Sequence, residues 1–289
     1  MDIRIGDKLI SQNSPTFMIA EIGINHNGNI EIAKKLIDEA INSGFDAVKF
    51  QKRTVDVVYT PDELEMPRES YFGKTNGDLK RGLEFGFEQY QEISEYCKEK
   101  NIIWFASPWD IKSVDFLENF DVPAHKVASA CLTDSKLLER IAETNKPVFM
   151  STGMSTMDQI KRAVNVFDPK RLILMHAVSV YPARLDQLNL SWIKNLQDHF
   201  PNLLIGYSGH EVGLIPSVVA VAKYNAVCVE RHITLDRSTW GTDQSASIEP
   251  QGMRNLIKNI RVLQVIVGDG EKHVLPEEIP IQKKLRKVN

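Results

Sequence analysis

The sequence predicts a single-domain α/β protein folded as a (β/α)8 TIM barrel. Short apolar runs alternate with helical patterns eight times along the 289 residues, which is the count that an eight-stranded barrel requires. The length agrees, since one such barrel commonly takes about 250 residues. A doubly wound open sheet usually has fewer strands, and no glycine fingerprint follows the first strand.

The chain divides into three parts. Residues 1–16 are expected to form an entry segment or small hairpin, residues 17–270 the barrel domain and residues 271–289 a C-terminal tail. Each expected strand is a short apolar run bounded by polar or turn residues. The predicted strands are 17–22, 46–51, 102–106, 124–128, 147–151, 172–177, 203–207 and 226–230. The predicted helices are 30–43, 87–100, 111–119, 135–144, 157–167, 185–200, 215–224 and 251–267.

One connection is much longer than the others. Residues 52–84 carry two prolines and three glycines without a clear apolar period, and they predict a long loop. Loops of this length inside a compact domain are usually functional or act as lids.

Composition bounds the classes of function. The formal net charge is −3, which gives no signal for nucleic acid, and the short basic cluster at residues 283–287 is typical of a solvated tail. Three distant cysteines, with no CxxC spacing, argue against a disulfide framework or structural zinc. No apolar run is long enough for a membrane span and no secretory signal opens the chain, so a cytoplasmic location is expected.

Two histidines suggest a metal site. His210 and His232 each follow an apolar strand, and these two strands are successive. A lone histidine after a strand is more often a surface or loop residue. Two on one rim of a barrel could hold a divalent cation and leave positions open for substrate and water.

Other polar residues also fall at predicted strand ends, where barrels carry their chemistry. Lys49 either points into a polar mouth or extends to solvent along its aliphatic stem. The segment Ser151-Thr-Gly153 either caps the next helix or offers backbone N–H groups to a phosphate. Two lysines and several hydroxyls at one mouth would suit a phosphorylated or carboxylated small anion.

Six segments together resemble the sialic acid synthase family. They cover nearly the whole chain, and they are specific in combination rather than singly. The segments are Ala20-Glu-Ile-Gly-Ile-Asn-His-Asn-Gly28, Val48-Lys-Phe-Gln51, Phe105-Ala-Ser-Pro-Trp109, Ser151-Thr-Gly-Met154, Gly206-Tyr-Ser-Gly-His210 and Arg231-His-Ile-Thr-Leu-Asp236.

The resemblance implies a TIM barrel that condenses phosphoenolpyruvate with an N-acylated amino-sugar aldehyde, and it implies a homo-oligomer. His210 and His232 would bind Mn2+ or Mg2+, and Glu21 would orient or deprotonate the attacking water. The expected phosphoenolpyruvate contacts are Lys49, Lys126, Ser129, Ser151, Ser179 and Ser208. The expected sugar contacts are Gln51, Tyr181 and Asp243.

Three departures from the family pattern put the sugar in doubt. Cys131 stands where better-known members have an acidic residue, and Gly209 stands where many have aspartate. The chain ends at Asn289, where those members continue into an antifreeze-like domain, so a member without that domain is expected. Two alternatives stay open. One is a related 3-deoxy-ulosonate synthase for a phosphorylated or shorter sugar, with loop arginines gripping a second phosphate. The other is a non-catalytic, sugar-binding descendant.

Overall fold

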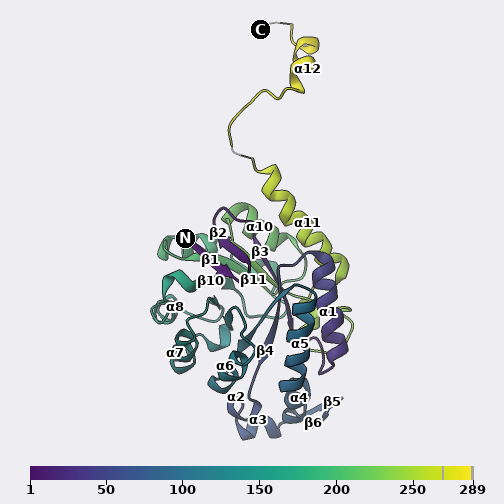
Figure 1. Ribbon diagram of the computed structural model, residues 1–289, viewed down its shortest axis with the longest axis vertical. Helices are drawn as coiled ribbons and strands as arrows, with labels where there is room; N and C mark the ends of the chain where they lie inside the picture. The colour runs from purple at the N-terminus through teal and green to yellow at the C-terminus, as the bar shows by residue number, and fades with distance from the viewer. Residues whose placement is uncertain (269, 288–289) are drawn as a thin grey trace.

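The computed structural model describes residues 1–268 and 270–287, and its centre is a closed barrel of eight parallel strands (Figure 1). The last strand pairs with the first, from Cys228 opposite Phe17 to His232 opposite Glu21, so the predicted (β/α)8 fold is confirmed. The barrel strands are β3 (Phe17–Gly23), β4 (Ala47–Lys52), β7 (Ile103–Pro108), β8 (His125–Val127), β9 (Val148–Ser151), β10 (Leu172–Ala177), β11 (Leu204–Gly209) and β12 (Cys228–His232).

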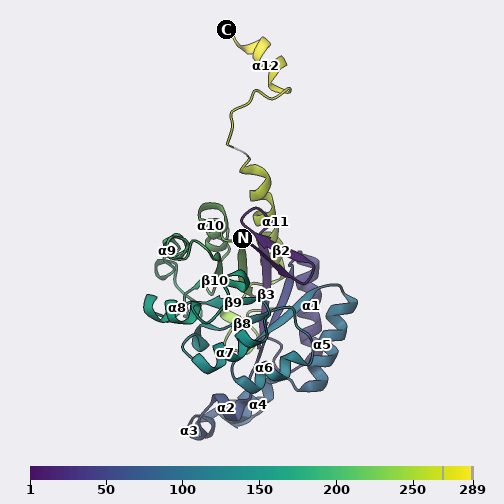
Figure 2. The ribbon, with the colours of Figure 1, turned by 60° about the vertical axis from the view of Figure 1, so that its left-hand side comes forward.

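Eight helices follow the strands and cover the outside of the barrel (Figure 2). α1 shows why they form where the sequence predicts them. Asn29 accepts hydrogen bonds from the backbone of Glu31 and Ile32, and Gly44 ends the helix in the left-handed conformation. The helices are α1 (Ile30–Ser43), α5 (Phe87–Glu99), α6 (Ile111–Glu118), α7 (Ser135–Glu143), α8 (Met157–Val164), α9 (Ser191–His199), α10 (Ile215–Tyr224) and α11 (Pro250–Ile266).

The helix predicted at 185–200 begins six residues late. Residues Leu185–Gln187 form one 3-10 turn instead, and α9 starts only at Ser191. Asn189 lies between them at a φ of 42°, a left-handed conformation that a right-handed helix cannot pass through.

The interior of the barrel contains an aromatic stack. The rings of Phe17 and Phe105 lie on either side of Phe149, with centroid distances of 6.0 and 5.3 Å. These residues belong to β3, β7 and β9, which are not neighbours in the sheet, so their rings meet across the inside of the cylinder. A second apolar cluster fills the space between β8–β11 and helices α7–α10.

The predicted long loop is partly wrong. Residues 52–84, called the lid segment below, contain α2 (Val55–Val58), α3 (Pro61–Glu65), a hairpin of β5 (Pro67–Ser70) and β6 (Gly73–Thr75), and α4 (Asn76–Leu83). Thr60 and Thr75 cap α3 and α4 by reciprocal capping boxes. α2 and α3 span only four and five residues, which is too short for hydrophobic periodicity to reveal them. α4 is as long as α6, but its only apolar side chains are Leu79 and Leu83, among glycine and polar residues.

The two ends of the barrel are covered differently. The N-terminal hairpin of β1 (Asp2–Ile5) and β2 (Lys8–Ser11) places Gly6 against Ile103, the first residue of β7. It therefore covers the amino-terminal ends of the strands, opposite the lid segment (Figures 1 and 2). α12 (Glu278–Leu285) lies beyond α11, away from the barrel. Residues 269 and 288–289, which belong to the predicted barrel end and tail, lie outside the described residues.

Candidate functional site

A polar pocket opens at the carboxyl ends of the barrel strands. It has a volume of about 350 Å3, counted with the solvent that it opens onto. Ten of the twelve predicted site residues line it, namely Glu21, Lys49, Gln51, Lys126, Ser129, Ser151, Tyr181, Ser208, His210 and His232. Ser179 and Asp243 lie just behind this lining, beside Ser129 and His232 respectively.

Two lysines and two carboxylates form the floor of the pocket. Lys49 Nζ lies 2.8 Å from Glu21 Oε2 and 3.7 Å from Glu230 Oε1, and it donates to Ser107 Oγ at 3.0 Å. Lys126 Nζ donates to Glu230 Oε1 at 3.2 Å. Lys49 and Lys126 are each 2% exposed, so the alternative in which Lys49 extends to solvent is wrong.

Burial and charge act against each other in this cluster. Burial lowers the pKa of Lys126, although Glu230 acts in the opposite direction. Burial alone would raise the pKa of Glu230, but Lys126 and Lys49 outweigh it and lower that pKa to about 2. Glu230 therefore stays ionised between the two lysines. Its Oε2 has no hydrogen-bond partner among the described residues.

Hydroxyl groups border the lysines on the side of β8, β9 and β10. Ser129 Oγ accepts a hydrogen bond from Gly153 N at 3.1 Å. The Oγ atoms of Ser151 and Ser179 are buried without a partner among the described residues. A Cβ on Gly153 would lie 2.3 Å from Ser179 Oγ, so only glycine allows this close approach. Unpaired buried hydroxyls are costly unless a ligand accepts from them.

Two expectations for the segment Ser151-Thr-Gly153 are wrong. Thr156, and not Ser151, caps α8. The backbone N–H of Thr152 is already bonded to Met175 O, and that of Gly153 to Ser129 Oγ. Ser151 thus contributes its hydroxyl to the pocket, while these two N–H groups are not free to bind phosphate.

The two histidines face each other across the pocket wall, with ring centroids 5.5 Å apart. His210 Nδ1 lies 2.7 Å from the carbonyl oxygen of Val178. Since a carbonyl only accepts, this nitrogen carries the proton and Nε2 presents its lone pair, which now accepts from Tyr181 Oη at 3.1 Å. Burial, and then the neighbouring His232, lowers the pKa of His210 to about 3, so the ring is neutral as metal binding requires.

These imidazoles fit an open divalent-metal site. A carbonyl that fixes the tautomer of a histidine is the usual partner behind a metal ligand. Within the described residues no group of three or more His, Cys, Asp or Glu side chains gathers to hold an ion. The two rings would thus leave the remaining coordination positions to water and substrate.

The other side of the pocket presents groups suited to a sugar. Gln51 donates to Glu21 Oε1 at 2.7 Å and accepts from Arg53. The guanidinium of Arg53 lies 4.0 Å from the ring centroid of Trp109, and Trp109 lines the pocket. Asp243 Oδ2 is 3.7 Å from His232 Nδ1, which is too long for a hydrogen bond.

The structure accounts for Gly209. A Cβ at this position would lie 2.7 Å from Glu211 Oε2 and 2.8 Å from the ring of Tyr207. Glu211 and Arg231 form a fully buried ion pair there, with a distance of 3.0 Å, and Tyr207 Oη donates to Glu211 at 2.7 Å. This network ties the ends of β11 and β12 together, and those ends carry the two histidines.

Cys131 lies in a 3-10 turn after β8 and packs into the apolar cluster outside the barrel. Burial raises the pKa of its thiol to about 12. The side chain is therefore a neutral filler, as its lack of an adjacent base in the sequence indicates.

Four residues that line the pocket were not among the predicted site residues, namely Ser107, Trp109, Ala128 and Glu230. Glu230 was identifiable in part, because it alternates with His232 on β12 and must share its face of the strand. Trp109 ends one of the six segments that resemble the family, but the sequence indicates no role for its side chain.

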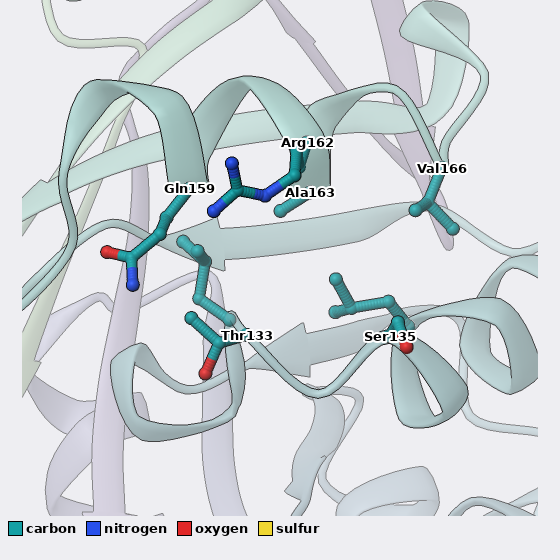
Figure 3. A pocket seen from close by; sticks show the side chains of 8 residues that line it. Thr133, Ser135, Gln159, Arg162, Ala163 and Val166 are labelled. Atoms are coloured by element: carbon teal, nitrogen blue, oxygen red, sulfur yellow. The ribbon is translucent and has the colours of Figure 1, made fainter.

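A second cavity lies on the outside of the barrel, between α7 and α8 (Figure 3). Gln159 and Arg162 from α8 border it together with Thr133 and Ser135 (Figure 3). Neither the lysines nor the histidines reach this cavity, and its walls are otherwise apolar. The barrel mouth is therefore the better candidate for chemistry.

Fold and pocket together define a class, the TIM-barrel proteins that hold an anionic small molecule at the carboxyl ends of their strands. The NeuB family profile matches residues 36–272, and the chain belongs to the NeuB family. The resemblance drawn from its motifs is confirmed.

The relatives are synthases of sialic acid and related sugars. The chain is 39% identical over 277 residues to the human N-acetylneuraminate-9-phosphate synthase, covering 94% of this chain and 77% of the relative. It is 35% identical to a Campylobacter jejuni N,N'-diacetyllegionaminic acid synthase, with coverages of 91% and 80%. A sialic acid synthetase from Leptospira borgpetersenii, solved with citrate, superposes with a TM-score of 0.85 at 30% identity, covering 100% of this chain and 98% of that one.

Membership in this family makes the chain a C–C bond-forming enzyme that uses phosphoenolpyruvate. Among the described residues, no helix is both long and apolar enough to cross a bilayer.

Proposed function

We propose that this enzyme condenses phosphoenolpyruvate with the aldehyde of an N-acylated amino sugar, giving a sialic-acid-like nonulosonate and inorganic phosphate. One observation carries the proposal. Two buried lysines and the buried hydroxyl of Ser151, which has no partner among the described residues, converge on a pocket whose opposite wall holds the imidazoles of His210 and His232. An anionic nucleophile and a carbonyl electrophile need such an arrangement.

Phosphoenolpyruvate binds on the lysine side. Its phosphate and carboxylate repel each other, and Lys49 and Lys126 neutralise both groups. Ser151 and Ser179 donate the hydroxyls that otherwise lack a partner, while Ser129 and Ser208 complete the contacts. The binding energy of these groups holds the methylene carbon toward the histidine side.

The sugar binds between this anion and the rim. Gln51, Tyr181 and Asp243 contact its hydroxyl and N-acyl groups. His210 and His232 would hold Mn2+ or Mg2+, which would supply a Lewis acid for the aldehyde. Tyr181 Oη, which donates to His210 Nε2 at 3.1 Å, would be free to donate to the substrate if that nitrogen bound the metal.

The reaction joins C3 of phosphoenolpyruvate to C1 of the open-chain sugar. The aldehyde oxygen takes a proton from the solvent that the pocket opens onto, and positive charge develops at C2 of phosphoenolpyruvate. Water adds at C2 and loses a proton to Glu21, which Lys49 and Gln51 hold in position. In the tetrahedral intermediate the bond between C2 and the phosphate oxygen then breaks. The C2 hydroxyl gives its proton to the departing phosphate, and the keto group forms.

The test is phosphate release from phosphoenolpyruvate with Mn2+ and N-acetylmannosamine or its 6-phosphate, with the keto-acid product identified by mass. Lys126→Met is the matched negative control. No product with a panel of five- and six-carbon aldoses, whether N-acylated or not, would contradict the proposal. Turnover restricted to non-acylated sugars would instead support the 3-deoxy-ulosonate alternative.

A non-catalytic descendant is the second alternative. It is disfavoured because the pocket keeps both lysines, both histidines and Glu21 in mutual reach. Calorimetry that detects neither phosphoenolpyruvate nor Mn2+ binding would favour it.

A further inference from the structure

A buried arginine links the ends of the two strands that carry the histidines. Arg231 is the residue before His232 on β12, and it pairs in register with Gly209, the residue before His210. Side chains alternate along a strand, so Arg231 points out of the barrel while His232 points into the pocket. The hydrogen bond from Arg231 to Ser217 on α10, at 3.0 Å, agrees with that direction.

The guanidinium of Arg231 holds the turn that follows His210. Nη2 donates to the backbone oxygen of Glu211 at 2.6 Å, and Nη1 donates to that of Gly213 at 2.9 Å. Nη1 also lies 3.0 Å from Glu211 Oε1, and Tyr207 Oη donates to the other oxygen of that carboxylate at 2.7 Å. The residue before one histidine therefore holds the residues that follow the other.

Stability alone does not explain this ion pair. The side chains of Arg231 and Glu211 are fully buried, and the cost of removing two charges from water offsets much of their attraction. Well-packed apolar residues of similar volume commonly stabilise a fold as well as such a pair does. A planar guanidinium differs because it meets a carboxylate and two backbone carbonyls at once, in fixed directions. It therefore fixes the relative position of two strand ends more strictly than apolar packing does.

His232 depends on its strand more than His210 does. The ring of His210 is fixed directly, since Nδ1 lies 2.7 Å from Val178 O and Nε2 accepts from Tyr181. His232 Nδ1 has no hydrogen-bond partner among the described residues, and the ring of Tyr181 meets it edge-on, with centroids 5.6 Å apart. The placement of the His232 ring relative to that of His210 therefore depends on the backbone of β12, which Arg231 anchors.

Building on the proposed function, we infer that Arg231 is a positioning residue, which holds His210 and His232 in the arrangement that binds a divalent cation. It lies outside the barrel and contacts neither ligand. Without the anchored guanidinium, the ends of β11 and β12 shift relative to each other, which weakens cation binding at the histidines and leaves the lysine side of the pocket in place. Replacing a side chain that orients a metal ligand typically costs about ten- to a hundredfold in metal affinity.

The experiment measures Mn2+ binding to the metal-free protein by calorimetry, with no substrate present. Arg231→Lys keeps the charge, but an ammonium group cannot meet the carboxylate and both carbonyls in the geometry of a guanidinium. We expect its Kd for Mn2+ to rise by about ten- to a hundredfold. Its Kd for phosphoenolpyruvate should change by about threefold or less, because Lys49 and Lys126 belong to β4 and β8. A general loss of structure would weaken both ligands alike.

Arg261→Lys is the matched control. Arg261 likewise donates to a backbone oxygen, that of Thr16 at 2.6 Å, and to a carboxylate oxygen, that of Asp46 at 2.7 Å. These partners lie just before β3 and β4, at the amino-terminal end of the barrel, so the Kd for Mn2+ should stay within about twofold. Ser217→Ala is a milder variant, which removes one hydrogen bond of Arg231. It should raise the Kd for Mn2+ by about two- to fivefold, and it remains informative if Arg231→Lys does not fold.

Failure of this inference is distinguishable from failure of the proposed function. An unchanged Kd for Mn2+ in Arg231→Lys and Ser217→Ala would overturn the positioning role. An equal loss of Mn2+ and phosphoenolpyruvate affinity, or a comparable loss in Arg261→Lys, would do the same. A wild-type protein that forms product but binds no Mn2+ would overturn it too, with the condensation intact. Mn2+ binding that depends on Arg231, without any product, would instead overturn the proposed function alone.

Discussion

The inside of the barrel holds two regions of opposite character. Phe17, Phe105 and Phe149 form an apolar stack, and Lys49, Lys126, Glu21 and Glu230 form an ionic cluster. The two are adjacent, because Lys49 pairs in register with Phe105 and Lys126 with Phe149. Residues that are neighbours in one closed sheet therefore belong either to an apolar stack, which packs without a ligand, or to a charged cluster, which lines the substrate pocket.

The difference shows how the barrel separates stability from function. Burying the aromatic rings stabilises the fold directly. Burying two lysines and two carboxylates gains little, because the desolvation of the charges offsets much of their attraction. The ionic cluster is retained at the carboxyl ends of the strands, where substrate enters, and the aromatic stack supports it.

Glu21→Gln should have the largest effect and should act on catalysis. The variant loses the carboxylate that takes the proton of the attacking water, so kcat should fall by roughly 10^2–10^4-fold. Steady-state phosphate release measures this, and KM for phosphoenolpyruvate should change far less. A variant within threefold of the wild-type kcat would show that Glu21 is not the base.

Phe149→Ala should act on stability instead. Removing the middle ring of the stack leaves a cavity and should lower the free energy of unfolding by about 3–5 kcal/mol. Thermal unfolding measures the loss, with Phe149→Leu as a control that fills most of the space. At a temperature where the variant is folded, its kcat should stay near the wild-type value. A large fall in kcat would show that the aromatic stack also contributes to catalysis, and would contradict the prediction.

Glu230→Gln should change how stability depends on pH. The pKa of Glu230 is lowered in the folded protein to about 2 from its usual 4.5. Its contribution to stability is therefore full above pH 4.5 and is lost as the pH falls toward 2. The difference in Tm between wild type and variant should shrink steadily between pH 5 and pH 3. A difference independent of pH would mean that Glu230 is not ionised between the lysines.

Asn29→Ala should have the smallest effect. Asn29 lies at the same end of the barrel as the ionic cluster, yet it only caps α1, by accepting from the backbone of Glu31 at 2.8 Å and of Ile32 at 3.2 Å. The loss should be about 1 kcal/mol of stability, visible in urea unfolding. We expect kcat and KM to stay unchanged, because Asn29 lies at the barrel mouth without taking part in catalysis. A fall in kcat would contradict this.

Prediction from sequence succeeded wherever the signal is local. The eight alternating runs located every barrel strand, and α1 and α10 match their predicted bounds at both ends. The polar strand ends brought ten of twelve expected residues to one pocket. The lid segment was predicted to be a loop because α2 and α3 are only four and five residues long and α4 has few apolar side chains, so no sustained apolar period marks them.

The amino-acid sequence by itself determined the barrel, the position of its mouth and the family, because hydrophobic alternation and short motifs are properties of neighbouring residues. Only the tertiary structure placed Glu230 against Lys126, which is 104 residues away, and left the hydroxyls of Ser151 and Ser179 without partners among the described residues. These contacts depend on how the strands close into a cylinder. Interactions between residues far apart in the sequence leave no local pattern. The pairing of the buried lysines with Glu21 and Glu230 can therefore be seen only in the tertiary structure.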